Sequence, residues 1–387
     1  MKKLIRLTTV PQSLGGLLKG QLKFMTQHYS VIGISSDSGD VNSLMAVSRD
    51  EGIRVEGVEM TRKITILRDI KALFRLYRIF KQEKPFIVHT HTPKAGTLGM
   101  VAAKLAGVPN RLHTIAGLPL VEQRGPKRRL LNLVERITYS AATRIYPNSY
   151  GLVDIILKNR FTNKTKLKVI GNGSSNGINT QYFSPNLFGS EKVVALKKEL
   201  EIVTTDFTFV FIGRLVKDKG INELIQSFVK LAEEMDYVKL LLVGSYESEL
   251  DPLLPDTVKT IETHDRILGV GWQADVRLYL LVSDTLVFPS YREGFPNVVM
   301  QAGSMELPGI VTNINGCNEI ITEGQNGFII PPKQVDALYT AMKKVALMQK
   351  EEIISMGKKA RKLVISKYEQ RFVWEELLKE YKKLENH

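Results

Sequence analysis

Residues 209–220 read FVFIGRLVKDKG, and this stretch decides the fold class. Four apolar residues run into Gly213, which is the pattern of a buried strand that ends at a turn. The amphipathic stretch 221–235 (INELIQSFVKLAEEM) follows Gly220 and predicts a helix. A strand, a loop bounded by glycines and a helix in this order are typical of one repeat of a parallel α/β sheet.

The loop within this stretch carries two cations, Arg214 and Lys219. In doubly wound sheets, ligands bind beyond the carboxyl ends of the strands, and backbone N–H groups near a helix N-terminus favour an anion. Arg214 can hold phosphate oxygens in a bidentate fork, and Lys219 adds a point charge. The loop therefore suits a diphosphate, although an ordinary turn with solvated charges fits the same residues.

Strand and helix patterns alternate in both directions from this stretch, which predicts parallel sheets with helices on both faces. A helix is expected over Ile64–Gln82 because its apolar residues stand near helical spacing. Those residues are Ile70, Leu73, Phe74, Tyr77 and Phe80. The runs expected to form strands are KKLIRLTT, YSVIGISS, PFIVHTH, TRIYPNS, LKVIGNG, FTFVFIG, VKLLLVG, RILGVGW, DTLVFPS and LPGIVTN.

Two domains are expected, because 387 residues exceed the usual size of one domain. A polar segment near residues 176–185 separates two series of strands and helices. Residues 1–185 hold 29 Lys and Arg against 11 Asp and Glu, a net charge of +18, whereas residues 186–387 carry −4. We therefore place the domains at 1–183 and 184–387. The charged helix expected at Arg371–His387 can pack on the second domain or cross back to the first.

Composition narrows the class of protein further. A single cysteine, Cys317, cannot form an internal disulfide or a cysteine-rich metal site. Arg6 interrupts the first apolar run, which favours a β-strand over a signal peptide, and no apolar run reaches the ~18 residues of a membrane span. These features lead us to expect a cytoplasmic protein. The basic first half should attract polyanions, namely an anionic membrane surface, lipid diphosphates or nucleic acid, unless it is only a solvated surface.

A second motif follows the predicted strand DTLVFPS, where residues 289–303 read PSYREGFPNVVMQAG. Pro296 suits the first turn of a helix, whose exposed N–H groups can bind phosphate or sugar hydroxyls. Glu293, on the loop, can accept hydrogen bonds from sugar hydroxyls, and Gln301 on the helix can contact a ribose. The alternative is a capped helix with a polar loop.

Together these motifs resemble those of glycosyltransferase family 4, whose members are retaining enzymes of the GT-B architecture. The resemblance rests on Gly213-Arg214, Lys219-Gly220 and the run from Pro289 to Asn297, and it extends to residues 314–332 (INGCNEIITEGQNGFIIPP). It also covers residues 169–183 and the pair Gly15-Gly16. It implies two Rossmann-like, doubly wound domains that face a cleft, with the acceptor on the N-terminal side and a nucleotide sugar on the C-terminal side.

The resemblance implies roles for individual residues. Arg214 and Lys219 would stabilise the departing diphosphate, and Glu293 would hold donor-sugar hydroxyls. The residues implied in donor binding are Gly15, Gly16, Gly213, Phe295, Pro296, Asn297, Val298 and Gln301. The sequence departs from the family at Gln301, where Glu is usual, and at Ala116, where a histidine is usual.

Weaker candidates lie elsewhere in the chain. His91 follows the strand pattern PFIVHTH, and because His89 and His91 alternate, we expect only one of the two to point inward. Lys94 is a candidate for phosphate, and Glu319 matches the family. We expect no metal and no cofactor, since the six histidines are scattered and the two cations can replace a divalent ion.

The function implied is transfer of a hexosyl or N-acetylhexosaminyl group from a nucleoside-diphosphate sugar, UDP being the usual nucleotide of the family. The acceptor implied is a glycan on a polyprenyl diphosphate, in bacterial capsule or O-antigen assembly. A sugar-nucleotide epimerase of similar fold is the alternative, and a polyanion-binding protein is a remote one. Nucleic acid is not expected as a partner, because no aromatic residues interleave with the basic ones.

Membrane docking is expected at the inner face of the cell membrane, through two features of the basic half. The apolar run Leu118–Val121 (LPLV) precedes the basic cluster 124–129 (RGPKRR), a combination that suits an anionic bilayer surface. A second basic stripe accompanies the helix expected after Ile64. Its members are Arg68, Lys71, Arg75, Arg78 and Lys81.

Overall fold

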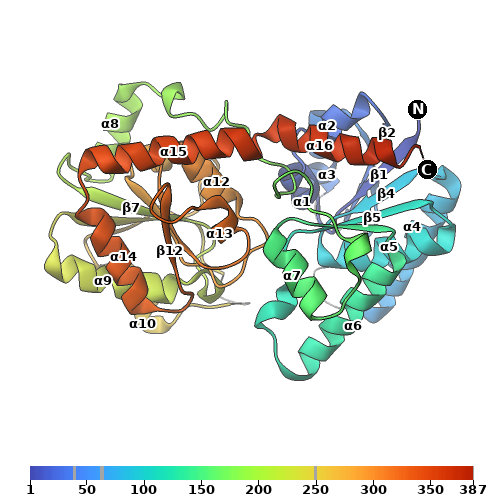
Figure 1. The fold of residues 1–387 in the computed structure, drawn as a ribbon, viewed down its shortest axis with the longest axis horizontal. Helices are drawn as coiled ribbons and strands as arrows, with labels where there is room; N and C mark the ends of the chain where they lie inside the picture. Colours follow the sequence, from blue (N-terminus) through green and yellow to red (C-terminus); the bar gives the residue numbers. More distant parts are fainter. Residues whose placement is uncertain (38–40, 62–64, 248–250, 387) are drawn as a thin grey trace. The chain divides into compact units, whose positions relative to one another are not determined.

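The computed structural model describes residues 1–37, 41–61, 65–247 and 251–386 of the chain. The chain forms two compact units, each built around a six-stranded sheet (Figure 1). The first unit comprises Met1–Gly177 and Arg371–His387, and the second comprises Ile178–Gln370.

The sheet of the first unit has the strand order β3-β2-β1-β4-β5-β6, with every neighbouring pair parallel. Its strands are β1 (Lys3–Leu7), β2 (Ser30–Ser35), β3 (Arg54–Gly57), β4 (Ile87–Thr90), β5 (Asn110–Ile115) and β6 (Arg144–Pro147). The order reverses direction at β1, so right-handed crossovers place helices on both faces. The helices are α1 (Pro11–Leu17), α2 (Gln21–Thr26), α3 (Val41–Glu51), α4 (Ile66–Glu83), α5 (Pro93–Ala106), α6 (Gly125–Ala141), α7 (Tyr150–Lys158) and α16 (Gln370–Lys383). Figure 1 shows α4, α5 and α6 on one face of this sheet.

The sheet of the second unit has the order β12-β11-β10-β7-β8-β9 and is also parallel throughout. Its strands are β7 (Phe207–Ile212), β8 (Val238–Val243), β9 (Ile267–Gly269), β10 (Thr285–Phe288), β11 (Gly309–Thr312) and β12 (Gly327–Ile330). Its helices are α8 (Ser190–Glu199), α9 (Ile221–Glu234), α10 (Pro255–Thr263), α11 (Arg277–Leu281), α12 (Asn297–Ser304), α13 (Cys317–Ile320), α14 (Val335–Ala346) and α15 (Lys350–Tyr368).

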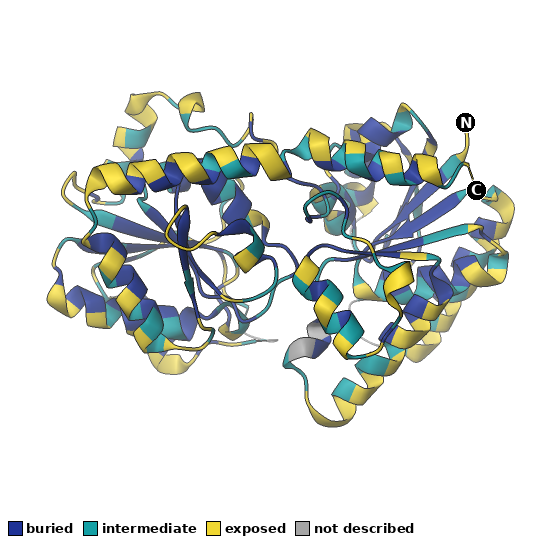
Figure 2. Ribbon diagram, viewed as in Figure 1, coloured by how far each residue is buried: buried dark blue, intermediate teal, exposed yellow. Residues whose placement is uncertain are grey.

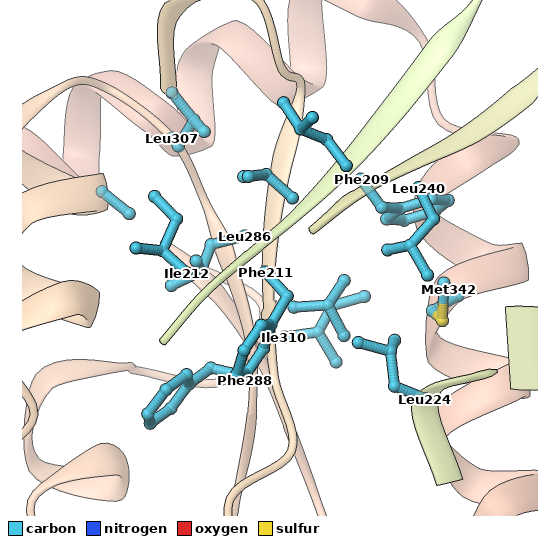
Figure 3. Close-up of a cluster of buried hydrophobic side chains, with 14 of the residues drawn as sticks. Phe209, Phe211, Ile212, Leu224, Leu240, Leu286, Phe288, Leu307, Ile310 and Met342 are labelled. Atoms are coloured by element: carbon cyan, nitrogen blue, oxygen red, sulfur yellow. The ribbon is translucent and has the colours of Figure 1, made fainter. Parts of the chain in front are cut away.

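The core of the second unit explains why the opening stretch forms a strand. Residues of β7 are buried on both faces of the sheet, which requires a nearly continuous apolar run instead of an alternating one. Phe211 packs beside Leu286 and Ile310 from the neighbouring strands β10 and β11, as Figure 3 shows, and its ring stacks on Phe288. Since β10 and β7 are adjacent, the loops that follow them meet at one edge of the sheet.

The strand predictions were wrong at four places. Residues LKVIGNG form no strand, because Gly171 and Gly173 adopt positive φ and turn the chain, leaving one bridge from Leu167. Three strands were not predicted. Strand β3 lies at the sheet edge with the polar sequence RVEG, β5 has the mixed polar and apolar sequence NRLHTI, and β12 directly follows a turn.

Helix α4 begins near the predicted start, although Ile64 lies outside the described residues. The helix buries Ala72, Leu76 and Phe80, whereas Ile70 and Phe74, which supported its prediction, are exposed. Figure 2 shows exposed residues along the outer side of the helices on this face. Within the described residues, no helix is long and apolar enough to cross a membrane.

The C-terminal helix α16 belongs to the first unit. It buries Val373, Leu377 and Tyr381, which recur every fourth residue, and the Trp374 indole donates to Asn176 Oδ1 at 2.6 Å. The compact units therefore differ from the limits 1–183 and 184–387 at the C-terminus, because α16 has one apolar face that needs a partner.

The boundary itself also lies earlier than residue 183. Ile178 N donates to Tyr368 O, and Arg361 Nη1 donates to Phe183 O at 3.0 Å. These bonds join the segment 178–183 to α15, which places it in the second unit.

Candidate functional site

The loop after β7 lies against the end of β10. Gly220 has φ +71°, and a Cβ there would lie 2.2 Å from Pro289 O, so this position accepts only glycine without rearrangement. Gly213 has φ +152° and lies against the loop after β8. A Cβ on Gly244 of that loop would lie 1.8 Å from Gly213 O. The sequence thus needs glycine where the loops after β7, β8 and β10 converge.

Lys219 and Glu293, which the sequence places on separate loops, form an ion pair. Their side chains are 19% and 16% exposed, so the pair is partly screened from water yet remains accessible. Ser290 Oγ donates to Glu293 Oε1 at 2.8 Å and fixes the carboxylate. The Lys219 ammonium also lies 5.1 Å from the Phe288 ring centroid. A cation and a carboxylate held together in this way can bind a phosphate and a hydroxyl of one ligand.

Arg214 lies on the same loop as Lys219 but pairs with Glu247, on the loop after β8. Its side chain is more than half exposed, which leaves the guanidinium able to change partners. The structure therefore joins Lys219 directly to Glu293 and holds Arg214 by a different carboxylate.

Residues that the sequence analysis did not select tie the Glu293 loop to the Lys219 loop and to the C-terminal end of β11 and the loop after it. Tyr291 N donates to Asp218 O at 2.9 Å, and Arg292 Nη2 lies 2.7 Å from Asp218 Oδ2. Asn315 Nδ2 donates to Glu293 O, and Thr312 Oγ1 donates to Ser290 O. The residues missed that act through their side chains are Asp218, Ser290, Arg292, Thr312 and Asn315. The pairing of Asp218 with Arg292 has a signal in the sequence. Asp218-Lys219 is an acidic residue followed by a basic one, and Arg292-Glu293 is the reverse, so the two dipeptides can form two ion pairs.

Helix α12 begins where the sequence predicts an anion-binding N-terminus. Pro296 is its N-cap and Asn297 its first residue, so the first N–H groups have no partner one turn earlier. Phe295 is buried, with its ring edge-on to Tyr368 at 5.2 Å. Val298 is half-buried, and Gln301, four residues after Asn297, lies on the same side of the helix as Asn297.

Glu319 lies at the start of the neighbouring helix α13. Its Oε1 accepts from Gly316 N at 3.4 Å, which caps that helix, and its carbonyl accepts from the Tyr368 hydroxyl. The adjacent Cys317 is fully buried, and burial followed by the charge of Glu293 raises the pKa of its thiol. Helix α13 thus lies close to the Lys219–Glu293 pair, and its thiol stays neutral there.

In the first unit, the expectation that only one of two histidines points inward was wrong. His89 and His91 are both buried, and their rings stack with centroids 4.5 Å apart. The alternation rule fails because β4 ends at Thr90, so His91 is no longer in a strand. Arg6 Nη2 lies 2.8 Å from His91 Nε2, and burial together with Arg6 lowers the pKa of His91 well below its usual value.

The other residues of the first unit that were expected to bind phosphate, Lys94, Gly15 and Gly16, make different contacts in the structure. Lys94 Nζ lies 2.7 Å and 2.8 Å from the two oxygens of Asp69, so its charge is already compensated. Gly15 and Gly16 lie within helix α1 and not in a loop. A Cβ on Gly15 would meet Val47 at 2.8 Å, which explains the glycine by helix packing instead of ligand approach. No group of three or more metal-ligating side chains occurs among the described residues.

Comparisons with known proteins identify the family. Residues 194–363 match the family described as glycosyl transferases group 1, and residues 31–173 match the glycosyl transferase 4-like domain. A capsular polysaccharide biosynthesis glycosyltransferase of Staphylococcus aureus, CapM, is 32% identical over 97% of this chain and 96% of its own length. An Escherichia coli UDP-Gal:alpha-D-GlcNAc-diphosphoundecaprenol alpha-1,3-galactosyltransferase is 30% identical over 82% of this chain and 80% of its own.

Solved structures show the same fold at low identity. HepE of Anabaena in complex with UDP-glucose has a TM-score of 0.80 at 16% identity, covering 99% of this chain and 100% of its own. A glycosyltransferase of Rickettsia africae has a TM-score of 0.78 at 20% identity, covering 99% of this chain and 98% of its own. The two parallel sheets therefore have the GT-B architecture. The chain belongs to the group 1, or family 4-like, glycosyltransferases.

Proposed function

We propose that this enzyme transfers a hexosyl or N-acetylhexosaminyl group from a UDP-sugar to a glycan carried on a polyprenyl diphosphate. The observation that supports this most is the partly exposed ion pair of Lys219 and Glu293 at the ends of two adjacent strands. The names of the S. aureus and E. coli relatives support the capsule-type pathway, the UDP donor and the diphosphate-linked acceptor.

Lys219 and Arg214 would bind the donor diphosphate and give up their present carboxylate partners, Glu293 and Glu247. The released Glu293 would then accept hydrogen bonds from sugar hydroxyls while Ser290 keeps it oriented. The first N–H groups of α12 would bind the remaining phosphate or sugar oxygens. Each group exchanges an internal partner for a donor atom, so none is left buried without a partner.

The reaction would proceed with retention at the anomeric carbon. The bond between that carbon and the β-phosphate oxygen breaks, and a bond to the acceptor oxygen forms on the same face. The acceptor proton passes to the departing phosphate oxygen, whose charge Lys219 and Arg214 stabilise. The two cations supply the electrostatic role that a divalent ion has in other transferases.

The test is a panel of nucleotide sugars against polyprenyl diphosphate-linked acceptors, with product anomers assigned by NMR. Transfer from one UDP-sugar with an unchanged anomeric configuration supports the proposal. Release of an epimerised sugar nucleotide without transfer, or product of inverted configuration, contradicts it. A cytoplasmic enzyme at the inner membrane face fits such an acceptor.

A further inference from the structure

The outer side of helix α4 exposes an apolar stripe of four large side chains. Its members are Ile66, Leu67, Ile70 and Phe74. Leu67 is 78% exposed and Phe74 is 61% exposed, although both have the chemistry of core residues. At 100° per residue, the four side chains lie within one third of the helix circumference. This sector does not overlap the sector of the buried residues. A contiguous exposed apolar stripe of this kind marks an interaction surface.

A basic stripe runs alongside this apolar stripe on the same helix. Lys71, Arg75 and Arg78 are exposed and follow one another at intervals of three or four residues. Arg68 begins the stripe and lies 3.4 Å from Glu59, and Lys81 ends it. The solvent side of α4 is therefore apolar along one edge and cationic along the other.

Helix α6 repeats this arrangement. Leu130, Leu133 and Ile137 are exposed at intervals of three and four residues, and the exposed Arg129 and Arg136 border them. Helix α5 packs between α4 and α6, so the three helices form one layer on the sheet. Leu105, near the C-terminal end of α5, is also exposed.

The loop from which the sequence predicts membrane docking does not supply this surface. Leu118 and Leu120 are buried in the core of the first unit, and the side chains of Pro119 and Val121 lie outside the described residues. The exposed apolar side chains come instead from α4 and α6, including Ile70 and Phe74.

We propose that the outer surface of α4 and α6 docks on an anionic lipid bilayer. The apolar stripes insert at the level of the lipid headgroups, and the basic stripes pair with lipid phosphates. A bilayer is the occupant that the charge favours, because a second copy of this basic unit would bring like charges together. The inference rests on the proposed function for the biological reason to dock, namely an acceptor held in a membrane.

The first experiment measures vesicle binding by sedimentation, with no substrate present. The full-length protein should bind vesicles containing phosphatidylglycerol more tightly than vesicles of phosphatidylcholine alone. The double variant Leu67→Ser/Phe74→Ser should lower the partition coefficient by roughly tenfold or more, because two large apolar side chains no longer leave water. The matched control Val194→Ser/Leu347→Ser changes two equally exposed side chains of the second unit and should bind as wild type.

Charge reversal separates the electrostatic part of binding from the apolar part. Lys71→Glu/Arg75→Glu should abolish the preference for phosphatidylglycerol, whereas Lys358→Glu/Lys359→Glu on α15 should keep it. Raising the salt concentration to roughly 1 M shortens the screening length to about 3 Å and should weaken wild-type binding without abolishing it. Equal binding by all variants would overturn the proposal.

Insertion can be observed directly, because Cys317 is the chain's single cysteine and is buried. An environment-sensitive dye on Leu67→Cys should shift its emission to the blue with anionic vesicles, and the same dye on Val194→Cys should not. Light scattering tests the competing occupant. A dimer that Leu67→Ser/Phe74→Ser dissociates, with no vesicle binding, would assign the surface to a second copy and overturn the bilayer proposal.

The outcome is independent of sugar transfer. Vesicle binding by a protein that transfers no sugar would contradict the proposed function and leave the docking surface intact. Transfer to a water-soluble acceptor, with no vesicle binding and no dye shift, would contradict the docking surface and leave the sugar-transfer activity intact.

Discussion

The two sheets of this protein place polar side chains near the carboxyl ends of their strands under opposite conditions. In the second unit, Lys219 and Glu293 stand on loops and keep part of their surface in water. In the first unit, Arg6, His89 and His91 are buried to 2% exposure or less. A charge that water reaches can exchange its partner for a ligand at small cost, whereas a buried charge cannot leave its partners without a large desolvation penalty. The comparison favours Lys219 and Glu293 for ligand exchange and favours a structural role for Arg6, His89 and His91.

Burying Arg6, His89 and His91 leaves some of their polar atoms without hydrogen bonds, which costs stability. Within the described residues, Arg6 Nε, Arg6 Nη1 and His91 Nδ1 have no hydrogen-bond partner. Burial lowers the pKa of Arg6 and, together with the neighbouring His91 and Arg6 charges, lowers that of His89. His89 is held by Tyr381 of α16 and by Thr114, so the network joins the C-terminal helix to the sheet.

The largest expected effect comes from removing the cation of the exposed pair. Lys219→Ala should lower kcat/KM by about 10³, because it removes a charge that stabilises the leaving group and leaves Glu293 without its partner. Steady-state transfer kinetics measure this effect, and the melting temperature should change little.

Lys217→Ala is the matched control for that variant, since Lys217 is an exposed lysine on the same loop. It should retain nearly wild-type kinetics. Equal activity of Lys219→Ala and Lys217→Ala would contradict the assignment of the site.

The second prediction concerns pH and the buried set. Burial lowers the pKa of His113 to about 4 from 6.5, so the unfolded chain binds the proton first as pH falls. Stability from this residue is therefore complete above pH 6.5 and should decline to a loss of about 3 kcal/mol near pH 4. Denaturant unfolding at several pH values should show a shallower decline for His113→Gln than for wild type. The half-buried His28→Gln is the control, and a decline unchanged in His113→Gln would contradict the prediction.

The third prediction tests the link from this network to α16. Tyr381→Phe removes the hydroxyl that bonds His89 Nδ1 and should lower the free energy of unfolding by about 2 kcal/mol, because a buried acceptor loses its partner. The ratio kcat/KM at a temperature well below unfolding should stay within about twofold of wild type, which is less than 0.5 kcal/mol. Tyr182→Phe, at a half-exposed tyrosine, should leave stability unchanged. A loss of catalysis without a loss of stability would move the buried set into the active machinery.

The sequence predicts the exposed site better than the buried one, for a physical reason. The loop glycines and charges of residues 213–220 and 289–297 follow from local rules about strand ends and helix starts. The burial of His91 does not follow from such local rules, because it depends on Arg6, which is 85 residues away in sequence. Gly15 shows the same limit, since a glycine can serve a ligand or, as in α1, close packing against Val47, whereas a Cβ on Gly16 would meet nothing within 4 Å.

Local periodicity also misplaced part of a helix surface. The spacing of Ile70 and Phe74 predicts α4 correctly, but these side chains are exposed while Ala72 and Leu76 occupy the core. Apolar residues occur on both the buried side and the exposed side of α4. The spacing alone therefore does not reveal which side contacts the sheet. That choice depends on the neighbouring helix α5, which no local pattern in α4 encodes.

The smallest expected effect belongs to the ion pair that aligns the two loops. Asp218 Oδ2 accepts from Arg292, and both side chains are about one third exposed, so their direct contribution to stability should be below about 1 kcal/mol. Asp218→Asn should nevertheless lower kcat about fivefold, roughly 1 kcal/mol, because Lys219 and Glu293 flank this pair and would be less well aligned. Asp336→Asn removes a more exposed ion pair, with Lys230 in the same unit, and should leave kcat unchanged. A double-mutant cycle with Arg292→Gln decides the mechanism. If the two losses add fully, the residues act separately and the alignment role is wrong, whereas a double variant no worse than either single one shows that the pair acts as a unit.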